Sequence, residues 1–187
     1  AGVPRNFSIW DRDDSLRAVK AELKRLDTEE WTPRQILGAI SREKGGGTTL
    51  SDYTERASTR REQTVAQIWE RYEQELKAQD SLDFDDLLVR TLMLARESPN
   101  ILSLLQNRWR YIIVDEYQDT SGVQYELMKL LSGERGNMCV VGDLDQCIYT
   151  WRQAEIENLL SFERVFPNVK VVRLEQNYRS TRTIIAA

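Results

Sequence analysis

The chain has 187 residues, of which 26 are Lys or Arg and 30 are Asp or Glu, so its formal net charge is −4. With 41% hydrophobic and 30% charged residues it can bury a core, which excludes a chain that is disordered throughout or collagen-like. It contains no histidine, which excludes a histidine general base, a histidine-ligated zinc ion and a Ser-His-Asp triad within this sequence.

The first half of the sequence predicts α-helices. Either Asp13 or Asp14 can cap the first helix. Its apolar stripe at helical spacing consists of Leu16, Val19, Leu23 and Leu26. Thr32 caps a second helix, in which Pro33 takes the first position, whereas the glycines of 44–49 predict a loop. A long polar helix follows over about 59–79, and its predicted buried face consists of Val65, Ile68, Trp69, Tyr72 and Leu76.

Two further helices are predicted before the pattern changes. Asp83 can cap the first of them, and Asp86, three residues on, makes a carboxylate variant of the capping box. That helix runs to about Arg96. Pro99 begins a shorter helix that ends near Arg108.

The remainder alternates strand and helix. Short β-branched runs occur at Tyr111–Val114, Cys139–Val141 and Val169–Val172, with amphipathic helices near Val123–Leu131 and Glu155–Phe166. This alternation is typical of an α/β fold. Because the runs are apolar at successive positions, both faces of each strand should be buried, which favours a parallel sheet.

Two predicted strands end in carboxylates. Asp115 and Glu116 directly follow the first, and Gly142, Asp143 and Gln146 follow the second. Ligands bind at the carboxyl ends of strands in open α/β sheets. There one carboxylate can hold Mg²⁺ and its neighbour can orient an attacking water, while an amide can bond a phosphate. The competing interpretation is a strand that ends in solvated acids.

Two aromatic residues and two arginines complete the candidate residues. Tyr149, Trp151 and Arg152 lie in a polar segment where rings can stack on unpaired bases, although aromatic residues are more often part of a core. Arg179 precedes Ser180 or Thr181, either of which can cap a helix. It can meet a phosphate at the edge of the sheet or pair with an acid such as Glu175 at the surface.

These segments resemble motifs II, III and IV of the UvrD/Rep/PcrA superfamily-one helicases. The matching residues are 115–120 (DEYQDT), 141–152 (VGDLDQCIYTWR) and 177–180 (NYRS), in the family's order and spacing, and 84–88 (FDDLL) resembles the segment before motif II. Leu144, Cys147 and Gln153 depart from the usual residues. The sequence holds no G-x-x-x-x-G-K-[ST] phosphate loop, because no Gly-Lys-Ser/Thr follows Gly45–Gly47.

The resemblance implies an α/β fold made of a partial RecA-like parallel sheet, half of a P-loop NTPase domain, with an α-helical insertion subdomain. Residues 1–105 are then a helical 1B-like subdomain, 106–175 the carboxyl-terminal part of RecA-like domain 1A, and 176–187 the start of domain 2A. Parallel pairing should join Tyr111–Val114, Met138–Val141 and Val169–Arg173.

The resemblance also implies roles for the residues of the nucleotide site. Asp115 holds the Mg²⁺ of Mg-ATP, and Glu116 is the general base or positions the hydrolytic water. Gln146 senses the γ-phosphate, and Arg179 stabilises charge on the phosphoryl group that is transferred. On the DNA side, Tyr149 and Trp151 contact single-stranded DNA and Arg152 contacts the same region.

The implied activity is that of an ATP-dependent DNA helicase that translocates 3′-to-5′ on single-stranded DNA and unwinds duplex DNA in repair or replication restart. Its partners are DNA and the remaining helicase domains. The chain by itself is expected to hydrolyse little ATP without a phosphate loop. The alternatives are the helicase part of a recombination nuclease-helicase and a catalytically inactive module that binds DNA or protein.

Cysteine content favours a cytosolic protein, and the resemblance implies a bacterial-type cytoplasmic protein associated with the nucleoid. Cys139 and Cys147 form no C-x-x-C pair, and two reduced thiols are favoured over a lone disulfide between them. No apolar stretch approaches the ~18–20 residues of a membrane span, and no signal peptide is recognised. Residues 1–4 read as an internal start within a longer protein rather than as a natural amino terminus.

Overall fold

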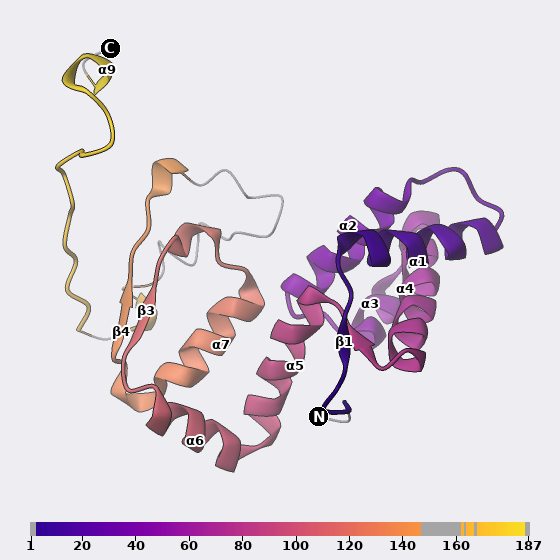
Figure 1. Cartoon of the computed structure of the whole chain (residues 1–187), viewed down its shortest axis with the longest axis horizontal. Coiled ribbons are helices and arrows are strands. Elements are labelled where there is room, and N and C mark those ends of the chain that lie inside the picture. Colours follow the sequence, from indigo (N-terminus) through magenta and orange to yellow (C-terminus); the bar gives the residue numbers. More distant parts are fainter. Residues whose placement is uncertain (1–2, 147–161, 163, 167, 186–187) are drawn as a thin grey trace.

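In the part of the chain that the structure describes, the protein is mostly helical and carries two small parallel sheets (Figure 1). The computed structural model describes residues 3–146, 162, 164–166 and 168–185. None of the helices in these ranges is long and apolar enough to cross a membrane.

Helix α1 (Arg12–Arg25) is capped by Asp11, not by Asp13 or Asp14 as the sequence predicted. The Asp11 carboxylate accepts hydrogen bonds from the amides of Asp13 and Asp14, and the Asp14 side chain accepts one from the Asp11 amide. A cap needs extended backbone in front of the helix, which Asp11 has with ψ −177°. Asp13 and Asp14 lie in the first turn, where negative charge favours the helix dipole.

Helix α2 (Pro33–Gly45) confirms Thr32 as the cap, but it continues past Lys44 into the predicted loop. Glycine in a helix costs roughly 1 kcal/mol relative to alanine. Here the Lys44 side chain is buried, and its Nζ lies 2.7–2.9 Å from the carboxylates of Glu73, Asp83 and Asp86. These tertiary ion pairs hold the last turn in helical form, so the loop begins only at Gly46.

Helices α3 (Leu50–Arg56) and α4 (Arg60–Ala78) are capped by Thr49 and Thr59, each in a complete capping box. Helix α3 was not predicted, since it is only seven residues long. All five residues predicted for the inner face of α4 are buried. The main hydrophobic core joins α1, α2, α3 and α4 and consists of Trp10, Val19, Leu23, Ile36, Ile40, Tyr53, Val65, Ala66, Ile68, Trp69, Tyr72 and Leu76.

Strand β1 (Ser8–Ile9) pairs in parallel with β2 (Ser81–Leu82), a contact that no local pattern predicted. Helix α5 (Phe84–Glu97) follows with the predicted cap: Asp83 accepts from the Asp86 amide at 2.7 Å, and the Asp86 side chain accepts from the Asp83 amide. Helix α6 (Pro99–Arg108) begins at the predicted proline.

The second sheet pairs β3 (Ile112–Val114) with β4 (Met138–Val140) in parallel, with Ile112 opposite Met138. Helix α7 (Gly122–Ser132) lies between them in sequence, close to the predicted range. The expectation that both faces of the strands are buried is wrong, because Ile113 is 77% exposed. Side chains alternate between the faces of a strand, and in the described part of the chain nothing covers the face that carries Ile113.

The expected third strand over Val169–Arg173 is not formed. These residues have no regular secondary structure, and Val171 and Val172 are exposed. A β-branched run becomes a strand only when a partner supplies its ladder of hydrogen bonds. The predicted helix at 155–166 falls largely outside the described residues. Helix α9 (Arg182–Ile185) follows Thr181, as the predicted cap placed it.

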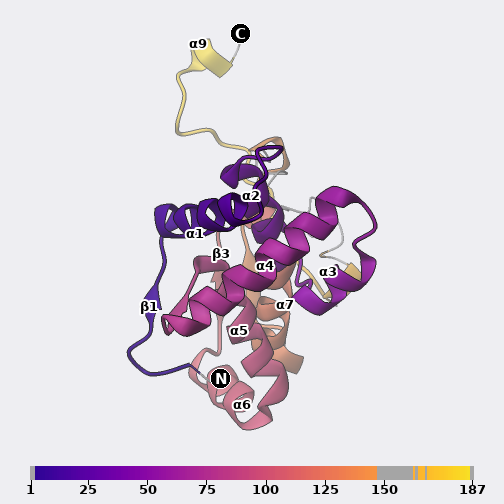
Figure 2. The same ribbon diagram turned by 90° about the vertical axis from the view of Figure 1, so that its right-hand side faces the viewer.

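Figures 1 and 2 show how these parts are arranged. Helices α1–α4 gather at one end, α6, α7 and the β3–β4 sheet lie at the other, and α5 lies between them. Helix α5 packs against both α2 and α7, so it connects the two ends. The carboxyl-terminal segment leaves the body and ends in α9.

Candidate active site

The carboxyl ends of β3 and β4 lie side by side, as predicted. The Val141 amide donates to the Val114 carbonyl at 2.8 Å, and the Tyr117 amide donates to the Val141 carbonyl at 2.9 Å. These bonds continue the pairing past both strands. They bring Asp115 and Glu116, which follow β3, next to the segment that follows β4.

Glu116 has a left-handed backbone, with φ 50° and ψ 43°. This conformation costs a residue other than glycine roughly 1–2 kcal/mol. It is held from both sides: the Glu116 amide donates to Asp115 Oδ1 at 2.9 Å, and its carbonyl accepts from the Asp119 amide at 2.9 Å. Asp27, Asp80 and Asn168 share this positive φ, so it is the strained backbone together with the place beside Asp115 at the end of β3 that makes Glu116 a candidate catalytic residue.

Gln118 connects the two strand ends. Its side chain is 1% exposed and lies in the 3₁₀ turn Tyr117–Asp119. Its Nε2 donates to Glu116 Oε2 at 2.7 Å, and its Oε1 accepts from the Asp143 amide at 3.1 Å. A Cβ at Gly142 would lie 3.0 Å from Gln118 Oε1, which explains the glycine at the turn after β4. No function of Gln118 was predicted from the sequence, where its only signal is its place in the turn that follows the carboxylate pair.

The hydrogen bonds continue from Asp143 to Gln146. Gln146 Nε2 donates to Asp143 Oδ2 at 2.6 Å, and the Asp145 amide donates to Asp143 Oδ1 at 3.0 Å. The bond from Gln146, followed by that from the Asp145 amide, lowers the pKa of Asp143 below its ordinary value. Asp143 is therefore ionised at neutral pH and holds the Gln146 side chain close to the strand ends.

Tyr117 forms the apolar floor of the turn. Its ring is buried and lies edge-on to Phe162 at 5.5 Å. Burial raises the pKa of Tyr117 to about 12, and its hydroxyl has no hydrogen-bond partner among the described residues. This phenol therefore stays protonated at neutral pH, and a carboxylate is the better candidate for a base.

The carboxylates suit a magnesium ion that arrives with a nucleotide. Mg²⁺ is commonly held by one or two carboxylates, with water and phosphate oxygens completing its shell. Asp115 is exposed at the strand end and can contribute one such ligand. The described residues contain no group of three or more His, Cys, Asp or Glu side chains that could hold a metal ion.

The remaining predicted residues are not brought to this cluster. Arg179 is exposed in the carboxyl-terminal segment, where its amide donates to Asn177 Oδ1 at 2.9 Å, and it makes no ion pair with Glu175. The three residues predicted to contact DNA, Tyr149, Trp151 and Arg152, lie outside the described residues.

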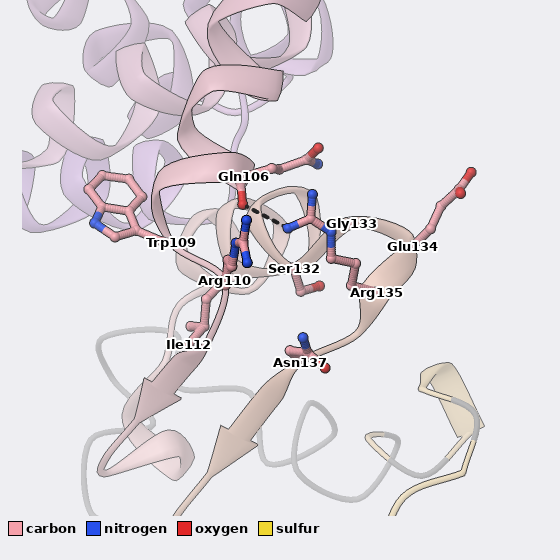
Figure 3. A pocket seen from close by; sticks show the side chains of 9 residues that line it. All are labelled: Gln106, Trp109, Arg110, Ile112, Ser132, Gly133, Glu134, Arg135 and Asn137. Atoms are coloured by element: carbon pink, nitrogen blue, oxygen red, sulfur yellow. Dashed lines mark hydrogen bonds between the residues drawn. The ribbon is translucent and has the colours of Figure 1, made fainter.

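A separate cavity of about 380 Å³ lies at the opposite ends of β3 and β4 (Figure 3). Its most prominent side chain is Arg135, which donates to the Gln106 carbonyl at 3.4 Å and to Asn107 Oδ1 at 2.8 Å. Because the cavity contains none of the carboxylates described above, it is distinct from the candidate active site.

Comparison with known proteins agrees with the motifs. The family model of the UvrD/REP helicase N-terminal domain matches residues 1–167. The chain is 45% identical over 188 aligned residues to the ATP-dependent DNA helicase PcrA of Staphylococcus aureus (strain Mu50 / ATCC 700699), and 46% identical to that of Bacillus subtilis (strain 168). The alignments cover 100% of this chain and 26% and 25% of those relatives. The chain thus spans about a quarter of their length.

Proposed function

The chain belongs to the UvrD/Rep helicase N-terminal domain family, and from this premise we propose that it is part of an ATP-dependent DNA helicase. The complete polypeptide translocates 3′-to-5′ on single-stranded DNA and unwinds duplex DNA, in repair or replication restart, in the bacterial cytoplasm. The observation that carries the proposal is the strained Glu116, which lies beside Asp115 and is hydrogen-bonded towards the end of the neighbouring strand.

ATP hydrolysis takes place at the carboxyl ends of β3 and β4. Asp115 would hold the Mg²⁺ of Mg-ATP, and the bound ion neutralises charge on the phosphates. Glu116 orients a water molecule for attack on the γ-phosphate and accepts its proton. The strained backbone at Glu116, held beside Asp115 by hydrogen bonds of its amide and carbonyl, supports this role.

Gln146 and Arg179 act on the γ-phosphate. We propose that the Gln146 amide exchanges its bond to Asp143 for one to the γ-phosphate, and so reports the state of the nucleotide. Arg179 supplies positive charge to the phosphoryl group. For this, either the segment that carries Arg179 moves to the ends of β3 and β4, or another element of the protein brings Arg179 and those strand ends together.

The division of the chain follows the same proposal. Residues 1–105 form the helical 1B-like subdomain, 106–175 the carboxyl-terminal part of the RecA-like domain 1A, and 176–187 the start of domain 2A. The remaining helicase domains are supplied by the rest of the complete polypeptide.

Single-stranded DNA contacts Tyr149, Trp151 and Arg152, which follow Gln146 within a few residues. Aromatic rings stack on bases of any sequence, as translocation requires. Because Gln146 and Trp151 are only five residues apart, a change in the bound nucleotide sensed by Gln146 can alter the affinity of this segment for single-stranded DNA.

The test is Glu116→Gln in the complete polypeptide, which keeps the shape and removes the base. ATP turnover should fall by about 10²–10⁴-fold, the usual share of a positioned base, while ATP and single-stranded DNA still bind. Glu134→Gln is the matched control, because Glu134 is an exposed glutamate at the opposite end of the same strands. Equal turnover in the two variants would refute the proposed role of Glu116.

The 187-residue chain provides a second test. It contains no G-x-x-x-x-G-K-[ST] motif, whose backbone amides and lysine cradle the phosphates in P-loop enzymes. Steady-state ATP turnover by this chain should therefore be close to background. Robust ATP turnover by this chain, stimulated by DNA and abolished by Glu116→Gln, would show that the chain binds the triphosphate without a phosphate loop.

A further inference from the structure

We propose that Gln118 is a positioning residue, which aims the Glu116 carboxylate at the attacking water and couples it to the Asp143–Gln146 segment. This inference rests on the proposed role of Glu116 in ATP hydrolysis. It adds the link by which the segments after β3 and β4 act together.

The first support is the direction of the hydrogen bonds. A carboxylate only accepts and a backbone amide only donates. The Gln118 amide group therefore fits between Glu116 and Asp143 in one orientation, with its nitrogen 2.7 Å from Glu116 Oε2 and its oxygen 3.1 Å from the Asp143 nitrogen. An ionised carboxylate, a hydroxyl or an apolar side chain of similar size cannot supply both bonds in the same way.

The second support is burial. Gln118 is 1% exposed, and Gly142 packs against its Oε1 so closely that a methyl group there would reach 3.0 Å. Water has little access to replace these bonds, and a buried polar group left without its partner is costly. Glu116, by contrast, is exposed, so the bond from Gln118 limits the freedom of a side chain that would otherwise sample many rotamers.

The third support is the continuity of the chain of contacts. It runs from Glu116 through Gln118 to the backbone of Asp143, and from the Asp143 carboxylate to Gln146 at 2.6 Å. When Gln146 turns from Asp143 towards a phosphate, the Asp143 segment is freed to shift, and Gln118 passes that shift to the Glu116 carboxylate. The carboxylate then takes its reactive position only when a γ-phosphate is present.

The experiment compares kcat and KM for ATP in the complete polypeptide with Gln118→Met, which has similar volume and makes neither bond. A loss of about 10²-fold in kcat is expected, as for a displacement of about 1 Å at a reacting group, with KM for ATP within about twofold of the unaltered protein. Gln106→Met is the matched control. Gln106 is a half-buried glutamine that donates to the Leu130 carbonyl at the other end of the strands, and its replacement should leave kcat unchanged.

A double variant separates positioning from general support of the fold. If Gln118 acts through Glu116, adding Gln118→Met to Glu116→Gln should lower kcat no further, whereas a purely structural role would make the two losses multiply. Multiplying losses, or wild-type kcat in Gln118→Met, would overturn the inference. Wild-type kcat in Glu116→Gln would instead refute the proposed function on which it rests.

A second, more conservative variant keeps the inference testable if the methionine variant fails to fold. A glutamate here would share a proton with Glu116 and keep both bonds, so the second variant is instead Gln118→Asn, which keeps the amide group on a side chain one methylene shorter. Asparagine cannot bridge Glu116 and the Asp143 amide as the glutamine does, so kcat should fall while KM for ATP stays close to that of the unaltered protein. Unchanged kcat in Gln118→Asn would reject the positioning role.

Discussion

Replacing Lys44 with methionine should destabilise the protein by about 3–5 kcal/mol, because it leaves buried carboxylates without their cation. Lys44 is 4% exposed, and its Nζ lies 2.7 Å from Glu73 and 2.9 Å from both Asp83 and Asp86. Tyr72 adds a hydrogen bond to Asp83 at 3.0 Å. The cluster joins α2, α4 and the start of α5, so the loss should be felt throughout the helical end of the molecule.

Lys44 stays positively charged at neutral pH. Burial alone lowers the pKa of Lys44, but the charges of Asp83, Glu73 and Asp86 outweigh it and raise that pKa above its ordinary value. A raised lysine pKa contributes stability that is fully present below about pH 10.4 and is lost only as the pH rises through the folded-state value. Without the lysine, the Asp86 carboxyl, whose pKa burial already raises, is relieved by taking up a proton, so Lys44→Met should cost more stability at about pH 8 than at about pH 6.

Thermal unfolding of the chain measures the effect. For a chain of this size, about 3–5 kcal/mol corresponds to a melting temperature lower by roughly 6–20 °C. Lys20→Met is the matched control, since Lys20 is exposed on α1, and it should change stability by no more than about 0.5 kcal/mol. Adding Asp86→Asn to Lys44→Met should restore part of the loss. Equal melting of Lys44→Met and Lys20→Met would refute the reasoning.

Three further predictions follow from single contacts. The amides of Thr59 and Ser58 lower the pKa of Glu62 to about 2, so its stabilising effect is present above about pH 4.3 and lost as pH falls through about 2; acid unfolding of Glu62→Gln should lack that dependence. Gly142→Ala places a methyl group against the buried Gln118 side chain, so the free energy of unfolding measured in urea should fall by about 1 kcal/mol. ATP turnover by the complete polypeptide should fall as well. Trp151→Ala should weaken single-strand binding by roughly 1–3 kcal/mol in a fluorescence titration, with normal melting. If Trp151→Ala instead lowered the free energy of unfolding by ~3–5 kcal/mol and bound single-stranded DNA normally, Trp151 would be a core residue.

Much of the helical part was predictable because its signals are local. The apolar face of α4 and the caps at Thr32 and Asp83 follow from spacing within one or two helical turns. The shift of the α1 cap from Asp13 or Asp14 to Asp11 is small, because several carboxylates in a row can each reach the first amides.

The parallel pairing of β3 with β4 was predicted and is confirmed, but the other contacts between segments far apart in sequence were not predictable. The β1–β2 pairing, the extension of α2 through Lys44 and the exposed face of β3 each depend on which distant segment is present as a partner. Val169–Arg173 has the composition of a strand and no ladder in the described structure. Composition alone therefore could not decide its conformation.

The candidate site likewise has a part that the sequence predicted and a part that only the fold determines. Asp115, Glu116 and Gln146 were predicted from residue type and position after a strand, because the chemistry of phosphate and magnesium requires carboxylates and amides at a sheet edge. The left-handed backbone of Glu116 and the bridge through Gln118 to Asp143 arise only when β3 and β4 pair in register. A hydrogen bond needs two groups within about 3 Å, and the fold alone brings residues 25 positions apart to that distance.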